Sequence, residues 1–365
     1  MRRILVGVLQ VLAAFCTCVA ASDNGTAGIS YKTAHAAVDA MNGYYNLTDG
    51  RWSTVDAWWL TGNALQAILD FMYKTGNRQY MDMVLNTIEK QKEPLPWYPE
   101  GGGIFRSDST DDTGWWALAM VRAFDLTGNQ RYLDYAILDE EYIYSYWNTS
   151  SCGGGVPWQI PTRSYKNAIS NELHIKLAAS IHNRIPGDRI YLERALQAWE
   201  WFRGSGMINA DHLINDGLAE SNGTCFNNGQ TTWTYNQGVI LGGLTELFRA
   251  VGEPSYLAEA REIADAVISS ETLSPNGVLT EPCDPAIGCN ADQANFKGIF
   301  ARNLAELDAV LADHPYHSYL VTNARTMVQN DRNATDYYGI DWRGPIMNST
   351  LGSQISAVSL LSTVI

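Results

Sequence analysis

The sequence predicts an all-α protein, an (α/α)6 barrel made of six helical hairpins. A plan of helix, Gly- or Pro-containing turn and second helix recurs five times along the chain. Each copy has a tyrosine near the start of its second helix, and these tyrosines lie 52 to 65 residues apart: Tyr80, Tyr132, Tyr191, Tyr256 and Tyr319. The two ends of the chain supply two further helical patterns. Five internal hairpins and one terminal pair therefore complete a ring of six inner and six outer helices.

The hairpins follow one another along the whole chain. The predicted helix pairs are 60–71 with 80–88, 111–124 with 131–146, 171–183 with 191–202, 236–250 with 256–268, and 292–311 with 319–328. Helices at about 30–45 and 351–365 are expected to close the ring. An open helical array is the alternative, but the last helix is apolar on most sides, as an inner barrel helix would be.

Polarity indicates which helix of each hairpin faces inward. The first helices are rich in Gly, Ala and Leu and nearly uncharged in their middles, whereas the second helices carry charged residues along one side, as in 194–200 and 259–265. A charged stripe marks a solvated outer face. The N-terminal ends of the inner helices should then share one rim, and the long loops that lead into them should build a cleft there.

The chain begins with a predicted secretory signal over residues 1–20. Arg2 and Arg3 precede a short apolar core, and small residues precede Ala21. This core is too short to span a membrane. Residues 21–365 are predicted to form a single domain, secreted to the cell exterior or cell wall. The C-terminal tail lacks the long hydrophobic stretch of a lipid-anchor signal, so no membrane anchor is expected.

The cysteines and the N-glycosylation sequons indicate that the chain passes through an oxidising and glycosylating secretory route. After signal removal four cysteines remain, and we expect two disulfides, Cys152–Cys225 and Cys283–Cys289, with the other pairings open. A zinc site is disfavoured because the sequence has no close Cys pair at zinc-finger spacing and no His near these cysteines. Predicted glycosylation sites are Asn24, Asn46, Asn148, Asn222, Asn333 and Asn348.

The charge balance restricts the partners. The formal charge of -14 becomes -16 without Arg2 and Arg3. So acidic a protein is not expected to bind nucleic acid or other anionic polymers, and suits a neutral or cationic partner. The 12 Trp and 19 Tyr are many for this length, and aromatic faces are surfaces on which sugar rings stack, although core packing accounts for most of them. A monomer is expected.

The stretch 109–116 is the strongest candidate for chemistry. Asp111 and Asp112 stand where an inner helix should begin, directly before Trp115 and Trp116. Acids at a helix start are often only caps. Paired carboxylates beside stacking aromatics are, however, the groups that glycoside-cleaving sites use. Because neighbours on a regular helix point about 100° apart, we expect both acids in the non-helical lead-in, from which both could reach one sugar.

The other inner-helix starts offer amides, hydroxyls and aromatics that suit a sugar site. The predicted substrate-binding residues at these starts are Trp58, Asn63, Trp115, Trp116, Trp158, Asn171, Glu172, Thr234, Tyr235, Asn236, Gln237, Gln293, Phe296 and Lys297. The same rim segments contain Trp59, Tyr165, Asn167 and Asp292. For any single Asn or Gln, capping of its own helix is an equally good interpretation.

Other chemistries lack their motifs. The Gly triplets are not followed by Lys-Ser/Thr, so a phosphate loop is not predicted. The six His are scattered, which disfavours a metal site. No Gly-x-Ser-x-Gly elbow is present. We predict neither a metal nor a cofactor.

Five separated segments resemble glycoside hydrolase family 76. They are Asp111-Asp112, 152–173 with its Cys-Gly-Gly-Gly start, Trp233–Gly238, Phe296–Phe300 and Asp341-Trp342. The resemblance implies an (α/α)6 barrel, endo-acting α-1,6-mannanase activity with retention at the anomeric carbon, and α-1,6-linked mannan or mannooligosaccharide as substrate. By the motif, Asp111 matches the nucleophile, Asp112 matches the acid/base, and Trp342 joins the substrate-binding set.

Alternatives to a secreted mannanase remain. One branch of the family is thought to transfer mannan-linked glycans in the cell wall, and a transglycosylase would use the same residues. A non-catalytic mannan-binding protein would keep the aromatics and amides without needing both acids. A structural wall protein would neither bind nor cleave mannan. A lyase or uronic-acid hydrolase on the same barrel would need more basic residues than Lys166 and Lys297, with Arg163 and Arg302 nearby.

Overall fold

The computed structural model describes residues 29–52, 57–93, 104–284 and 288–365. The predicted signal segment and the sequon at Asn24 lie outside the described residues. Of the other sequons, Asn46, Asn222, Asn333 and Asn348 are exposed and Asn148 is half-buried, so their glycosylation stays a prediction. Within the described part of the chain, no helix is both long and apolar enough to cross a bilayer.

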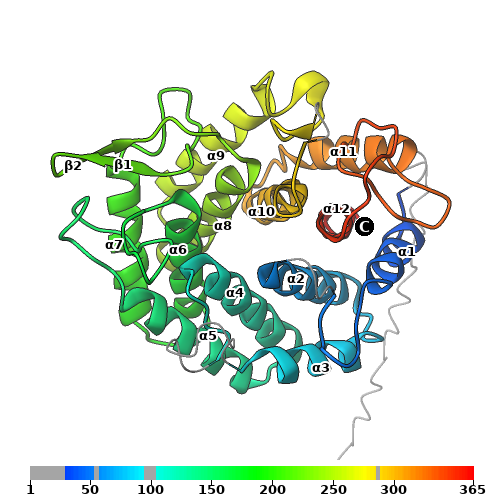
Figure 1. Ribbon diagram of the computed structural model, residues 1–365, viewed down its shortest axis with the longest axis horizontal. Coiled ribbons are helices and arrows are strands. Elements are labelled where there is room, and N and C mark those ends of the chain that lie inside the picture. The colour runs from blue at the N-terminus through cyan, green and yellow to red at the C-terminus, as the bar shows by residue number, and fades with distance from the viewer. Residues whose placement is uncertain (1–28, 53–56, 94–103, 285–287) are drawn as a thin grey trace, which may run out of the picture.

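In the described part of the chain, six helices form an inner ring, whose arrangement can be followed in Figure 1. They are α2 (Trp58–Thr75), α4 (Thr110–Thr127), α6 (Ala168–His182), α8 (Thr234–Val251), α10 (Phe296–Val310) and α12 (Leu351–Thr363). Each inner helix packs against the next, and α12 packs against α2, so the ring closes. The last helix is therefore an integral wall of the barrel.

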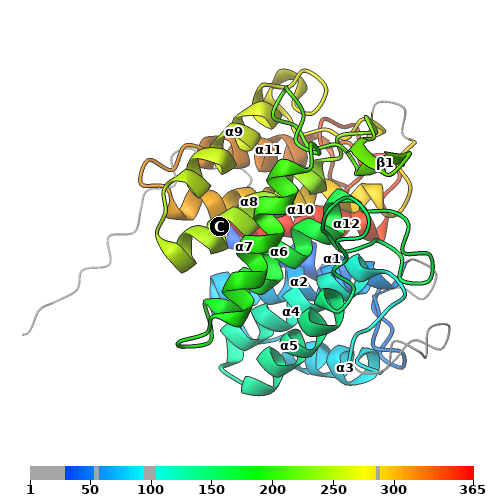
Figure 2. The ribbon, with the colours of Figure 1, turned by 90° about the vertical axis from the view of Figure 1, so that its left-hand side faces the viewer.

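Six further helices among the described residues surround this ring. They are α1 (Tyr31–Asn42), α3 (Met81–Gln91), α5 (Gln130–Tyr144), α7 (Ile190–Gly204), α9 (Ser255–Ser269) and α11 (His317–Asn330). Figure 2 shows α5, α7 and α9 as an outer layer over α4, α6 and α8, against which they pack. The helix α1 packs on α12, which makes the terminal pair that the sequence predicts.

Burial separates the two rings. Every residue of α6 up to Ile181 is buried, and so is every residue of α12 up to Ser362. In contrast, α3 buries only Val84, Thr87 and Ile88. The nearly uncharged sequences of the inner helices thus have neighbours on all sides, whereas one apolar stripe is enough for an outer helix.

Glycine ends several inner helices at the predicted turns. Gly76, Gly128 and Gly252 have φ values of 75°, 69° and 72°, a left-handed conformation that glycine adopts without a Cβ penalty. The Gly128 N–H donates to Phe124 O at 2.7 Å, which satisfies a terminal carbonyl of α4. This turn chemistry explains why the hairpin plan can be read from the sequence.

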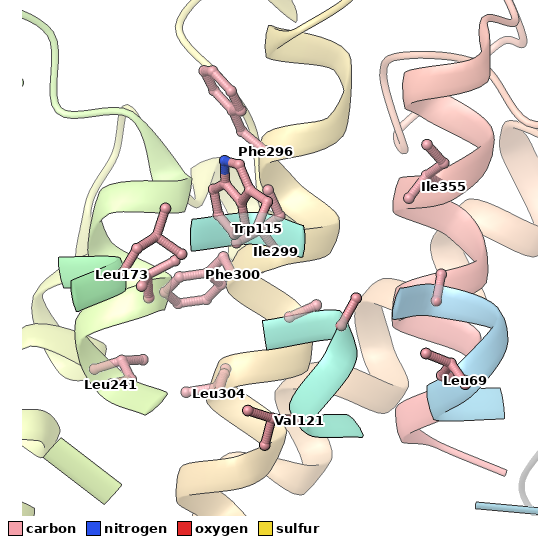
Figure 3. Close-up of a cluster of buried hydrophobic side chains, with 14 of the residues drawn as sticks. Leu69, Trp115, Val121, Leu173, Leu241, Phe296, Ile299, Phe300, Leu304 and Ile355 are labelled. Atoms are coloured by element: carbon pink, nitrogen blue, oxygen red, sulfur yellow. The ribbon is translucent and has the colours of Figure 1, made fainter. Parts of the chain in front are cut away.

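Apolar side chains fill the barrel interior. Figure 3 shows Trp115 and Phe296 at one end of a packed column, with Phe300 and Leu173 beside them and Val121, Leu304 and Leu69 toward the other end. These side chains come from α2, α4, α6 and α10. The end that holds Trp115 and Phe296 is the end where the inner helices begin.

A small antiparallel hairpin departs from the all-α prediction. Strands β1 (Leu218–Ser221) and β2 (Thr224–Asn227) pair through a turn at Asn222-Gly223, where both residues have positive φ. Asn-Gly is the strongest short hairpin signal in a sequence. The disulfide Cys152–Cys225 ties this hairpin to the loop before α6, and the second disulfide is Cys283–Cys289, the two pairings expected from the sequence.

Candidate active site

The N-terminal ends of the inner helices surround an open cleft of about 360 Å³. The loops before α2, α4, α6, α8 and α10 all contribute to its walls. The lining residues are Ala57, Trp59, Asp108, Ser109, Asp111, Asp112, Trp115, Trp158, Gln159, Tyr165, Asn167, Asp216, Tyr235, Asp292 and Phe296. This is the rim on which the sequence predicts a site.

Asp111 and Asp112 both line this cleft from the first turn of α4. The expectation that they precede the helix is wrong, because α4 already begins at Thr110. Thr110 is held there by two bonds to the neighbouring loop: its N–H donates to Trp158 O at 2.9 Å and its hydroxyl donates to Pro157 O at 2.7 Å. The first turn of a helix has no preceding turn above it, so two successive side chains can both reach the cleft.

The two carboxyls have different surroundings. Burial raises the pKa of Asp111 to about 7, although hydrogen bonds from backbone N–H groups and from the side chains of Ser109 and Trp158 oppose this rise. One of these bonds runs from the Asp112 N–H to Asp111 Oδ1 at 3.0 Å. Burial and then the charge of Asp111 raise the pKa of Asp112 well above its usual range. Both carboxyls are thus harder to ionise than a free aspartate, and Asp112, which also faces the charge of Asp111, is the harder of the two to ionise.

Aromatic rings form much of the cleft. Tyr235 and Phe296 stack with their centroids 3.8 Å apart, and the Trp59 centroid lies 5.7 Å from that of Trp115. Trp158 is 36% exposed, and its ring meets Tyr165 edge-on at 6.4 Å. Exposed and partly exposed rings at the edge of a cleft offer flat apolar faces to a ligand.

Polar side chains complete the lining. Asp216 Oδ2 accepts from the Tyr165 hydroxyl at 2.5 Å, and Asn228 Nδ2 donates to that hydroxyl at 2.9 Å. Asn167 is the N-cap residue of α6, but its side chain makes no capping bond, and its Oδ1 has no partner among the described residues. Asp216 and Asn167 thus present oxygen atoms that can accept hydrogen bonds from a ligand.

Each pair of consecutive tryptophans is divided between the cleft and the core. Trp59 and Trp115 line the cleft, whereas Trp58 and Trp116 stack on each other beneath it at 4.8 Å. Trp116 is fully buried, and Trp58 Nε1 donates to Gln91 Oε1 at 2.9 Å. The prediction that Trp58 and Trp116 contact a substrate is therefore corrected, because the two rings pack on each other, and Trp116 also on Phe105, below the cleft.

Several predicted amides bind neighbouring backbone groups, of loops or of their own helix, instead of lining the cleft. Asn171 exchanges two hydrogen bonds with the backbone of Val156, at 2.8 and 3.1 Å. Gln237 does the same with Ile214, at 2.7 and 2.8 Å. Asn63 Nδ2 donates to Trp59 O at 3.3 Å. These buried side chains position the cleft walls from below.

The remaining predicted residues also lie outside the cleft lining. Lys297 is buried in an ion pair with Asp284 and covers the ring of buried Trp342, with its Nζ 4.9 Å from the ring centroid. Thr234 binds buried Glu281 through its N–H and its hydroxyl. Gln293 accepts from the Asn290 N–H at 3.0 Å. Glu172 and Asn236 are fully buried, with no partner for their side-chain polar atoms among the described residues.

The structure also brings forward residues that the prediction did not select. Asp216 comes from the loop before β1 and not from the start of an inner helix. The repeated hairpin pattern therefore gave no signal for it. Asp108 and Gln159 lie in loops that meet at the antiparallel bridge between Ser109 and Gln159. The fold brings Asp216 and Gln159 to the cleft, whereas Asp108 stands directly before α4 in the sequence.

No metal centre is supported by the described residues. The two clusters with suitable ligand spacing are Cys152, Glu220, Cys225 and Cys283, Asp284, Cys289. In both clusters the cysteines are joined in disulfides, which removes the thiolates that a soft metal site would use.

The paired aspartates, the aromatic cleft and the ring of helices agree with the results of comparison with known proteins. Residues 29–365 match the profile of glycosyl hydrolase family 76. The chain belongs to this family. This family 76 chain is 32% identical over 280 residues to a putative mannan endo-1,6-alpha-mannosidase of Schizosaccharomyces pombe, covering 73% of the chain and 62% of that relative. It is 26% identical over 342 residues to the mannan endo-1,6-alpha-mannosidase DFG5 of Saccharomyces cerevisiae, covering 88% and 73%.

Solved structures confirm the fold of this family 76 chain. The GH76A alpha-1,6-mannanase of Salegentibacter sp. HEL1_6 superimposes with a TM-score of 0.81 at 23% identity, covering 92% of the chain and 98% of that structure. Dfg5 from Chaetomium thermophilum, solved in complex with glucosamine, gives 0.78 at 19% identity and covers 92% and 89%. The prediction of an (α/α)6 barrel is therefore confirmed.

Proposed function

We propose that this protein is a secreted endo-α-1,6-mannanase that cleaves the backbone of α-1,6-linked mannan with retention and acts as a monomer. The observation that carries the proposal is the meeting of Asp111 and Asp112 in one cleft with aromatic walls. Family membership and the printed names of the relatives support it. A variant of the Salegentibacter enzyme, inactivated by changing two consecutive aspartates, was solved in complex with alpha-1,6-mannotetrose.

The cleft offers two kinds of contact to a mannan chain. Trp158, the most exposed of the lining tryptophans, presents a ring on which a sugar can stack. Asp216 and Asn167 present acceptor oxygens to sugar hydroxyls. The lining holds no Lys or Arg among the described residues, which suits an uncharged polymer better than an anionic one.

In the first step Asp111 acts as nucleophile. Its carboxylate attacks C1 of the mannose unit, the bond between C1 and the bridging oxygen breaks, and that oxygen takes the proton of Asp112. The hydrogen bonds that Asp111 receives stabilise its charge before the attack. The raised pKa of Asp112 keeps it protonated for its role as general acid.

In the second step the roles reverse. Asp112, now a carboxylate, takes a proton from water, and the water oxygen attacks C1 while the ester bond to Asp111 breaks. Two inversions at C1 return the α configuration. If a sugar hydroxyl replaces this water, the same intermediate gives transfer, so product analysis separates a hydrolase from a transglycosylase.

The two aspartates can be distinguished with two substrates. We expect Asp111→Asn to abolish product release from both α-1,6-mannotetraose and an aryl α-mannobioside with a good leaving group. Asp112→Asn should lower the rate on mannotetraose by about 10²–10⁴-fold, because general acid catalysis is lost. It should retain a burst of aryl release, because a good leaving group needs no proton.

A matched control keeps this test specific. Asp134→Asn changes an exposed aspartate on α5, away from the cleft, and should leave both rates unchanged. Ordinary turnover by Asp111→Asn or by Asp112→Asn on mannotetraose would contradict the assignment. Binding of mannotetraose by the wild-type protein without any product would indicate a non-catalytic mannan-binding protein.

A further inference from the structure

The charges in the cleft are all of one sign. Among the described residues that line it are five aspartates, and none is Lys, Arg or His: Asp108, Asp111, Asp112, Asp216 and Asp292. Arg302 lies behind Trp115, 5.7 Å from its ring centroid, and is bound to Asn63. Carboxylates that lie close together without a neighbouring cation make it harder for one another to ionise, and those whose charges act on Asp112 are Asp111, Asp292 and Asp108.

One of these carboxylates is held by a residue whose backbone is bonded in turn to the core. Asp292 precedes the short helix η4 (Gln293–Asn295), and its Oδ1 accepts from Trp59 Nε1 at 2.7 Å. Trp59 O accepts from Asn63, whose Oδ1 accepts from Arg302 Nη2 at 2.8 Å. An indole N–H is a neutral donor, so it fixes the carboxylate without cancelling its charge.

We propose that Asp292 is a positioning residue for the reaction: fixed by Trp59, its negative charge acts on Asp112 across the cleft and keeps the proton on that acid. This inference rests on the proposed function. Asp112 faces carboxylates from three segments, namely Asp111 on α4, Asp108 in the lead-in to α4, and Asp292 before α10. It also faces the hydroxyl groups of Ser107 and Ser109, and Tyr235 lines the cleft from α8.

Asp292 differs from Asp111 in what happens to its charge during turnover. When Asp111 becomes an ester, its charge is lost and its effect on Asp112 disappears. Asp292 takes no part in covalent chemistry, so its charge persists through both steps. After burial, the charges that raise the pKa of Asp112 include those of Asp111, Asp292 and Asp108. Asp292 therefore supports acid catalysis without touching the reacting atoms.

The test is the pH dependence of kcat/KM on α-1,6-mannotetraose. Asp292→Asn removes the charge and should lower the pKa of the basic limb by about one unit, the effect of a like charge at close range. Trp59→Phe keeps the ring but releases the carboxylate, and should shift this limb in the same direction by less. Asp216→Asn changes a carboxylate bound to Tyr165 and should lower kcat/KM at every pH without moving the limb.

Each outcome decides the inference. A basic limb that stays in place in both Asp292→Asn and Trp59→Phe, while the wild-type protein cleaves the substrate, overturns the role of Asp292 and leaves the proposed function intact. Absence of cleavage by the wild-type protein overturns both. Thermal unfolding of each variant shows whether it is folded. If Asp292→Asn does not fold, the pH profile of Trp59→Phe decides the test.

Discussion

At the scale of the residue, burial without a partner decides how several carboxyls behave. Asp139 lies on α5, fully buried, and neither of its oxygens has a hydrogen-bond partner among the described residues. Burial raises its pKa well above the usual range, and the charge of Arg106 opposes this only in part. We therefore expect the carboxyl to take up a proton when the chain folds.

This proton uptake makes stability depend on pH. Between the unfolded pKa of about 3.9 and the raised folded pKa, the native state binds more protons than the unfolded state, so the free energy of unfolding falls as pH rises. Asp139→Asn should remove a slope of up to about 1.4 kcal/mol per pH unit. Urea unfolding between about pH 5 and pH 7 measures it.

The exposed neighbour Asp134 provides the control for this prediction. Asp134→Asn, on the same helix, should leave the slope of the wild-type protein unchanged. Parallel stability curves for the wild-type protein and Asp139→Asn would show that Asp139 does not take up a proton on folding.

The residue scale is also where the sequence was least informative. Asp111, Asp112, Trp115, Trp158, Tyr235 and Phe296 were predicted and line the cleft. Trp58 and Trp116 were predicted alongside them but stack beneath it. A helix start fixes which segment reaches the rim, but the direction of each side chain depends on packing against other helices, which a sequence pattern does not contain.

At the scale of the element, the loops around the cleft are held by bonds from below. Lys166 Nζ donates to Asn148 O at 2.6 Å and to Ser151 O at 2.7 Å, and also to Gly154 O. Asn171 clamps the next stretch of the same loop at Val156. Asn171 was predicted to bind substrate and Lys166 only to lie on the rim. Their partners are instead backbone groups of loops, which only the fold brings within reach.

The disulfide Cys152–Cys225 fastens this loop to the hairpin that follows Asp216. It closes a loop of 73 residues, so its removal in Cys152→Ala/Cys225→Ala should lower the free energy of unfolding by about 4 kcal/mol. The walls that carry Tyr165 and Asp216 should loosen, and KM for mannotetraose should rise while kcat changes less. Denaturant unfolding and steady-state kinetics measure the two effects.

The second disulfide is the matched comparison. Cys283–Cys289 closes a loop of only 6 residues, for which the same relation gives about 2 kcal/mol. Equal losses of stability from the two double variants, with KM unchanged in both, would contradict the role given to Cys152–Cys225.

At the scale of the whole molecule, the closed ring could be predicted because each hairpin repeats the same local chemistry. Gly turns such as Gly76 and Gly128 end inner helices, and the apolar α12 completes the wall between α10 and α2. The cleft follows from this closure, because six helix starts meet at one end. The position of Asp216 did not follow, since it depends on an irregular loop that only the assembled barrel places against the start of α6, where Asp216 O accepts from the Ala168 N–H.

The central claim is that Asp111 and Asp112 cleave an α-1,6-mannosidic bond by two successive displacements at C1. The most direct measurement is NMR of the first products formed by the purified protein from α-1,6-mannotetraose, recorded before the sugars mutarotate. The account predicts that the new reducing end appears first as the α anomer and that the β anomer grows in only later. First appearance of the β anomer, or no product at all, would contradict it.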